Sequence, residues 1–171
     1  MSQALEFYVR NMGRMSQASF LERVNCPVLV EASASTDASD NERAFRTEYV
    51  SLSDVMASRA QSPGQREVLL VKKREGALFS GHIGVGRTPN LDICIPRHGI
   101  SKFHAYFSVG ADGSYQLTDK DSKNGTFVGG TRLTQGVPVS IPNNTEVRFA
   151  AHVFRFMQPL HFFELIRSMA A

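Results

Sequence analysis

The chain has 171 residues, 42% of them hydrophobic and 20% charged, with a formal net charge of +3. This length and composition suit one main domain with extensions, and no apolar run approaches the length of a membrane span. The small positive excess falls wholly in residues 67–171 and lacks the clustering that nucleic-acid-binding proteins show, so we expect neither a nucleic acid nor a membrane as partner.

The cysteines and the N-terminus indicate the compartment. Cys26 and Cys94 form no metal-ligand spacing with each other or with the histidines, and two cysteines in a chain of this length make a poor disulfide framework. We therefore expect no metal and two reduced thiols. The opening MSQALEFYVR lacks a basic segment followed by an apolar one, so we predict an unexported, cytoplasmic protein.

Residues 1–66 are predicted to form an N-terminal extension without a chemical motif. Ser19 and Glu22 have the spacing of a capping box, which indicates a short helix. Small and acidic residues fill 31–42, and such a stretch buries too little apolar surface to order itself, so it is predicted to be a mobile linker. The other predicted elements are strands at Cys26–Glu31 and Phe45–Leu52 and a helix at Ser53–Arg59.

From Glu67 onward, short runs of alternating apolar and polar residues are separated by Gly, Pro, Asn and Asp. Many short strands at close spacing favour a β-sandwich or barrel, here assigned to residues 67–158. The predicted strands are Val68–Lys73, His82–Gly86, Leu91–Ile95, Phe103–Val109, Tyr115–Asp119, Thr126–Val128, Val137–Ile141, Glu146–Phe149 and His152–Met157. Residues 159–171 are predicted to form an amphipathic helix, because Pro159 suits the first helical position and apolar residues then follow at helical spacing.

Four features fall in the loops between these strands, where a rigid sandwich would present them together. Gly86-Arg87 ends one strand, and the segment GISKFH, with Ser101 three residues before His104, joins the next pair. Asn124-Gly125 is a strong turn signal, and the segment VGGT forms another turn. In this order, the set resembles the forkhead-associated (FHA) domain over roughly Glu67 to Met157.

The resemblance implies a mainly β fold, a sandwich of about eleven short strands that binds phosphothreonine peptides with loops at one end and uses no cofactor. It implies a non-enzymatic signalling module that reads the output of Ser/Thr kinases. The partner would be a phosphothreonine-containing protein, such as a kinase or its substrate. The phosphate- and peptide-binding residues implied by position are Arg87, Ser101, Lys102, Lys123 and Asn124, and the structural support of the site would come from Gly86, His104 and Gly125.

The chain departs from the family pattern at positions that bear on its ligand. Lys123 stands where many members have threonine or serine, and Gly99 offers no side chain where some members read a residue beyond the phosphothreonine. Phe103 replaces a polar or basic residue, and by alternation it is expected to point toward the core with Ala105 and Phe107.

Three alternatives are weighed against phosphothreonine binding. A phospho-independent interaction scaffold is favoured by Lys123 and Gly99, because a pocket can lose its ligand while the fold persists. Self-regulation would follow if Thr36 in the linker were phosphorylated and occupied the site. The Ser-x-x-His spacing also invites a hydrolase reading, but nothing resembles G-x-S-x-G, and we expect no catalytic residue.

Overall fold

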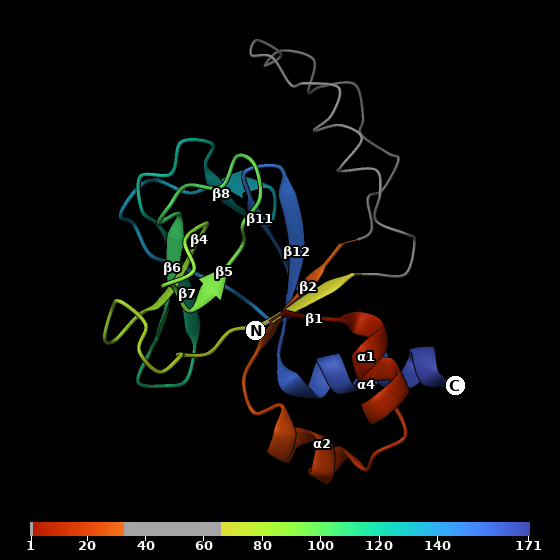
Figure 1. Ribbon diagram of the computed structural model, residues 1–171. Coiled ribbons are helices and arrows are strands. Elements are labelled where there is room, and N and C mark those ends of the chain that lie inside the picture. The colour runs from red at the N-terminus through yellow and green to blue at the C-terminus, as the bar shows by residue number, and fades with distance from the viewer. Residues whose placement is uncertain (1, 33–65) are drawn as a thin grey trace, which may run out of the picture.

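Two β-sheets pack into a sandwich in the computed structural model, which describes residues 2–32 and 66–171 (Figure 1). The seven-stranded sheet has the order β1-β3-β2-β12-β11-β8-β9, and the five-stranded sheet has the order β10-β7-β6-β4-β5. The first sheet comprises β1 (Ser2–Ala4), β2 (Val28–Glu31), β3 (Glu67–Leu70), β8 (Thr126–Val128), β9 (Thr131–Arg132), β11 (Thr145–Phe149) and β12 (His152–Met157). The second comprises β4 (Ile83–Gly86), β5 (Ile93–Cys94), β6 (Ala105–Val109), β7 (Tyr115–Asp119) and β10 (Val139–Ser140).

The main core lies between the two sheets and is built from alternate residues of each strand. Phe107 of β6 stacks on Phe156 of β12 with ring centroids 6.2 Å apart, and both side chains are fully buried. Because neighbouring residues of a strand point to opposite faces, the period-two pattern determines which side chains enter this core. The predicted mainly β sandwich with a C-terminal helix is confirmed.

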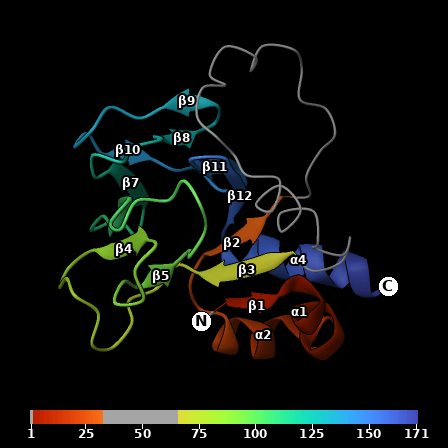
Figure 2. The ribbon, with the colours of Figure 1, turned by 45° about the horizontal axis from the view of Figure 1, so that its top comes forward.

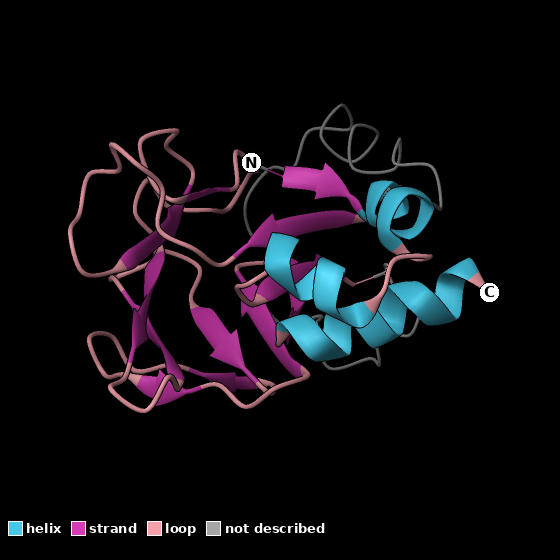
Figure 3. Ribbon diagram, turned by 90° about the horizontal axis from the view of Figure 1, so that it is seen from below, coloured by secondary structure: helices cyan, strands magenta, loops and turns pink. Residues whose placement is uncertain are grey.

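A second core lies on the outer face of the seven-stranded sheet, under three helices that gather on one side of the molecule (Figures 2 and 3). These helices are α1 (Leu5–Met12), α2 (Gln17–Arg23) and α4 (Pro159–Ala170). In β2, Val28 and Val30 face this helical layer, whereas Leu29 between them faces the sandwich core. Tyr8 and Phe20 both pack on Phe162 of α4, so the two ends of the chain share one apolar layer.

The N-terminal segment contributes structure that the sequence pattern did not reveal. Strand β2 lies between β3 and β12, so it is an inner strand of the sheet and not an appendage. Helix α2 begins at Gln17, and its cap is Ser16 and not the predicted Ser19, because the Ser16 hydroxyl accepts the Ser19 N–H at 3.3 Å. Strand β1 and helix α1 were not predicted.

Several sequence-based expectations fall on residues that the structure does not describe. Residues 33–65 contain most of the predicted linker, the predicted strand Phe45–Leu52, the predicted helix Ser53–Arg59, and Thr36. The division of the chain at residues 66 and 158 stays a prediction. Within residues 2–32 and 66–171, no helix combines the length and apolar character needed to cross a bilayer.

Candidate functional site

Arg87 and Ser101 meet at one rim of the sandwich. Arg87 directly follows β4, and its backbone N–H donates to the Ser101 carbonyl at 2.9 Å. Gly86 makes this approach possible, because a Cβ there would lie 2.4 Å from the Lys102 carbonyl oxygen. The Arg87 side chain is exposed and Ser101 is half-buried, so a guanidinium and a hydroxyl face solvent from adjoining loops.

The loop between β7 and β8 joins the same rim. The Lys123 N–H donates to Ser101 Oγ at 3.1 Å, and Asn124 Nδ2 donates to the Gly99 carbonyl at 2.8 Å. Gly125 has φ +83°, the left-handed conformation that the Asn-Gly signal predicts. Arg87, Ser101, Lys123 and Asn124, which lie up to 37 residues apart in the sequence, are therefore neighbours in space.

His104 links the two loops from beneath. Its side chain is fully buried, Nδ1 accepts the Ser101 N–H at 3.1 Å, and Nε2 lies 3.1 Å from the Gly125 carbonyl. Burial lowers the pKa of His104, so the neutral ring has an acceptor at Nδ1 and a donor at Nε2. With both nitrogens engaged by backbone groups, this histidine is placed to brace the loops.

Asp119 is a buried support of the site that the sequence motifs do not include. At the end of β7, its Oδ1 accepts the Ser122 N–H at 3.0 Å, and its Oδ2 accepts the hydroxyls of Ser122 and Thr126. Burial would raise the pKa of Asp119, but these hydrogen bonds outweigh it and hold the pKa below its ordinary value. The one sequence signal for this role is the D-x-x-S spacing of Asp119 and Ser122. Aspartate side chains often accept hydrogen bonds from backbone N–H groups a few residues further along the chain.

The rim carries an excess of positive charge. Arg87, Lys102 and Lys123 are exposed, and Arg132 Nε lies 2.8 Å from the place where a Cβ of Gly125 would stand. Of the acids in the β7–β8 segment, Asp119 is committed to its hydroxyl donors and Asp121 is exposed, so the cations outnumber the free carboxylate. The rim therefore presents cations, a hydroxyl and a side-chain amide, which are the groups that bind a phosphate and an adjoining main chain.

An ionic cluster ties the Ser101 loop to the strands on either side of residues 33–65. Arg97 Nη1 pairs with Glu31 Oε1, and Nη2 lies 2.7 Å from Glu67 Oε2. The Glu67 N–H also donates to Glu31 Oε2 at 3.1 Å, and all three side chains are at least partly buried. Arg97 lies four residues before Ser101, so it anchors the start of the Ser101 loop to β2 and β3.

Replacing Arg97 by methionine is expected to lower the free energy of unfolding by about 1–3 kcal/mol, because two partly buried carboxylates then lose their partner. Urea denaturation of the full chain measures this loss. The matched control is Arg155→Met, in which an exposed arginine loses only its contacts with Asn144. Equal stability of the two variants would show that the cluster around Arg97 does not stabilise the fold.

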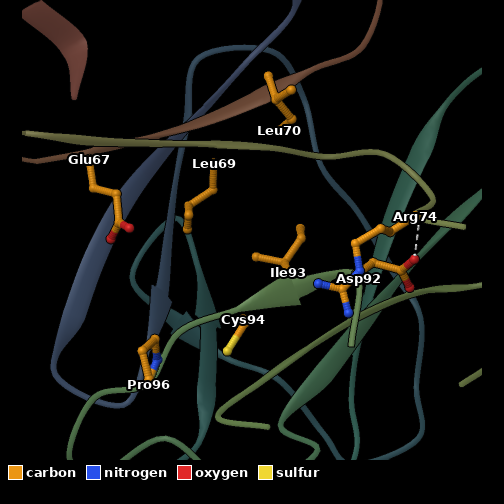
Figure 4. Close-up of a pocket in the computed structure, with 8 residues that line it drawn as sticks. All are labelled: Glu67, Leu69, Leu70, Arg74, Asp92, Ile93, Cys94 and Pro96. Carbon is orange, nitrogen blue, oxygen red and sulfur yellow. Dashed lines mark hydrogen bonds between the residues drawn. The ribbon is translucent and has the colours of Figure 1, made fainter. Parts of the chain in front are cut away.

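One pocket of about 260 Å³ lies between β3 and β5 (Figure 4). It is lined by Glu67, Leu69, Leu70, Arg74, Asp92, Ile93, Cys94 and Pro96. Of its two acidic residues, Glu67 pairs with Arg97, and Asp92 is buried and bonded to Lys73 Nζ at 2.9 Å and to the Arg74 N–H at 2.7 Å. None of the residues predicted for phosphate binding lines this pocket.

The comparisons with known proteins agree with the motif order. The family model of the FHA domain matches residues 83–150, which contain every residue predicted for the site. Among curated proteins, none matches the chain.

Several solved structures are similar. The FHA domain of CT664 from Chlamydia trachomatis is 22% identical, with a TM-score of 0.47, over 77% of this chain and 95% of that one. The N-terminal FHA domain of Rad53p from S. cerevisiae, solved with a phosphothreonine peptide, is 17% identical, with a TM-score of 0.46, over 82% and 98%. EmbR from Mycobacterium tuberculosis, solved with a low-affinity phosphopeptide, is 23% identical, with a TM-score of 0.42, over 61% of this chain, which spans 28% of EmbR.

Proposed function

Because the family model of the FHA domain matches residues 83–150 of this chain, we propose that its rim binds a threonine-phosphorylated peptide and leaves it chemically unchanged. The observation that carries the proposal is the convergence of Arg87, Ser101, Lys123 and Asn124 on adjoining loops. A phosphothreonine brings a charge of about −1.5 to −2 and three acceptor oxygens, which match this set of donors.

Each residue has a proposed role. The planar guanidinium of Arg87 forms charge-assisted hydrogen bonds to the phosphate, and Ser101 donates its hydroxyl to the same group. The ammonium groups of Lys102 and Lys123 add attraction, although each is a point charge on a flexible stem and fixes the geometry less well. Asn124 holds the peptide main chain in register. Gly86, His104 and Gly125 support the loops.

We propose that the cellular role is that of a non-enzymatic adaptor in Ser/Thr kinase signalling, with a phosphorylated kinase or kinase substrate as partner. The free thiols of Cys26 and Cys94 are consistent with the proposed cytoplasmic location, because disulfides are rare in that compartment. The second candidate, a phospho-independent scaffold, is favoured by Lys123 and Gly99. Deleting residues 1–66 would be a poor way to separate the two, because it removes the inner strand β2.

Calorimetry on the full chain tests the proposal with a degenerate phosphothreonine peptide library and its unphosphorylated counterpart. We expect only the phosphorylated library to bind, because the cations of the rim attract the charged phosphate and an unmodified threonine carries no charge. Equal affinity for both libraries would favour the phospho-independent scaffold. Absence of binding to either would refute a peptide-binding rim.

A further inference from the structure

An apolar surface lies beside the proposed phosphate site. Leu78 and Phe79 are 60% and 36% exposed, and the Phe79 ring stacks on Phe103 with centroids 4.7 Å apart and planes inclined by 17°. The Tyr106 ring lies 6.3 Å from Phe103. We call Phe79, Phe103 and Tyr106 the aromatic platform, and Leu78 precedes Phe79 in the chain. Contiguous exposed apolar residues of this kind mark interaction sites more often than isolated ones do.

The platform lies on the outer face of the five-stranded sheet, which corrects the expectation that Phe103 enters the core. Residues 101–104 are not part of a strand, so alternation does not extend to Phe103, and this side chain is absent from the buried core. Its ring lies over Gly84, where an added Cβ would stand 3.6 Å from Phe103 Cε2. Tyr106 is paired with Gly84 across β4 and β6, so it shares that face.

The platform is within reach of a peptide held at the rim. Phe103 follows Ser101 by two residues. Gly84, which lies under the Phe103 ring, precedes Arg87 by three residues in the chain. Three residues of extended chain span about 10 Å, so a peptide bound by Arg87 and Ser101 reaches the Phe79–Phe103 stack within two to four residues. Lys102, between Ser101 and Phe103, is exposed.

We propose that the aromatic platform binds an apolar side chain of the same peptide, two to four residues from its phosphothreonine. This inference rests on the proposed function and adds a sequence preference to it. The stacked rings offer a flat, rigid apolar surface, which binds aliphatic and aromatic side chains with little loss of conformational entropy. The preferred ligand is therefore a phosphothreonine peptide with a Leu, Met or Phe in that range, and not a uniformly polar one.

The test uses the full chain and a peptide series with one fixed phosphothreonine and otherwise polar flanks. Leucine or serine is placed in turn at positions two, three and four on either side, and affinity is measured by calorimetry. We expect leucine to be preferred about three- to tenfold at one or two of these positions. Phe79→Ala should remove the preference while leaving the affinity for the all-serine peptide unchanged. Leu160→Ala is the matched control, because Leu160 is 38% exposed on α4 in the helical layer.

The outcomes separate this inference from the proposed function. The platform proposal alone would be overturned if phosphate-dependent binding showed no leucine preference. It would also be overturned if the Phe79→Ala variant kept the preference, or if Leu160→Ala removed it as well. A concentration-dependent dimer that Phe79→Ala dissociates would assign the platform to a second copy of the chain and would overturn it as a peptide site. Failure of the unmodified protein to bind any phosphothreonine peptide would overturn both.

Discussion

Replacing Arg87 by alanine is expected to weaken the binding of a phosphothreonine peptide about a hundredfold, because hydrogen bonds to charged groups are among the strongest that side chains make. The phosphate oxygens then lose a forked donor that neither lysine of the rim can reproduce. Arg87→Lys keeps the charge but not the forked pair of donors. Its affinity should therefore lie between those of the unmodified protein and Arg87→Ala, at about a tenfold loss. Calorimetry with a single peptide selected from the library gives these affinities.

The fold is expected to survive the Arg87→Ala substitution. The side chain is exposed, and the contact that joins its loop to Ser101 is made by the backbone N–H, which alanine retains. Thermal unfolding should therefore give the same midpoint as for the unmodified protein. Arg167→Ala, which removes an exposed arginine from α4, should leave peptide affinity unchanged. If Arg87→Ala binds the peptide as tightly as this control, the arginine is not a phosphate ligand.

The strands were predictable wherever the alternation is local and bounded by turn residues. Three predicted ranges coincide with β7, β8 and β12. The prediction Leu91–Ile95 was too long, because only Ile93–Cys94 pairs with β4, in the parallel sense. The alternation of Leu91, Ile93 and Ile95 reports that all three side chains are buried, but burial does not record which residues pair with a neighbouring strand.

Elements that depend on distant contacts escaped prediction. Helix α1 has a single short apolar face, and its position becomes clear only when Tyr8 is seen packed on Phe162, with ring centroids 5.2 Å apart. Such a short helix draws most of its stability from tertiary packing. Arg97 was missed as an anchor for the same reason, since Glu31 lies 66 residues before it.

The residues of the candidate site were easier to name than the residues that hold them. Motif order alone selected Arg87, Ser101 and Asn124, and the structure places them on adjoining loops. The supporting carboxylate of Asp119 was overlooked, because an aspartate at the end of a strand is ordinary in sequence. Its importance lies in burial with three hydrogen-bond donors, which no linear pattern records.

Replacing Asp119 by asparagine is expected to lower the free energy of unfolding by about 3 kcal/mol, because an amide nitrogen cannot accept the hydrogen bonds that one carboxylate oxygen now accepts. The hydroxyls of Ser122 and Thr126, both buried, lose that acceptor. Since they flank Lys123 and Asn124, the affinity for the phosphopeptide should fall as well. Asp121→Asn makes the same chemical change at an exposed position of the same loop, and asparagine tolerates its φ of +58°. Equal urea midpoints for the two variants would contradict this role of Asp119.

The acid dependence of stability gives an independent test of Asp119. Because its pKa in the folded protein lies below the ordinary 3.8, its contribution to stability is fully present above that value and is lost as the pH falls through the folded pKa. The stability gap between the unmodified protein and Asp119→Asn should therefore be constant from pH 7 to about pH 5 and should narrow below about pH 4. Asp92, whose pKa is also lowered, contributes to the acid sensitivity of both proteins and cancels in the difference. A gap that stays constant to the lowest pH at which both proteins fold would mean that the charge of Asp119 contributes nothing and that the cost of the substitution is steric.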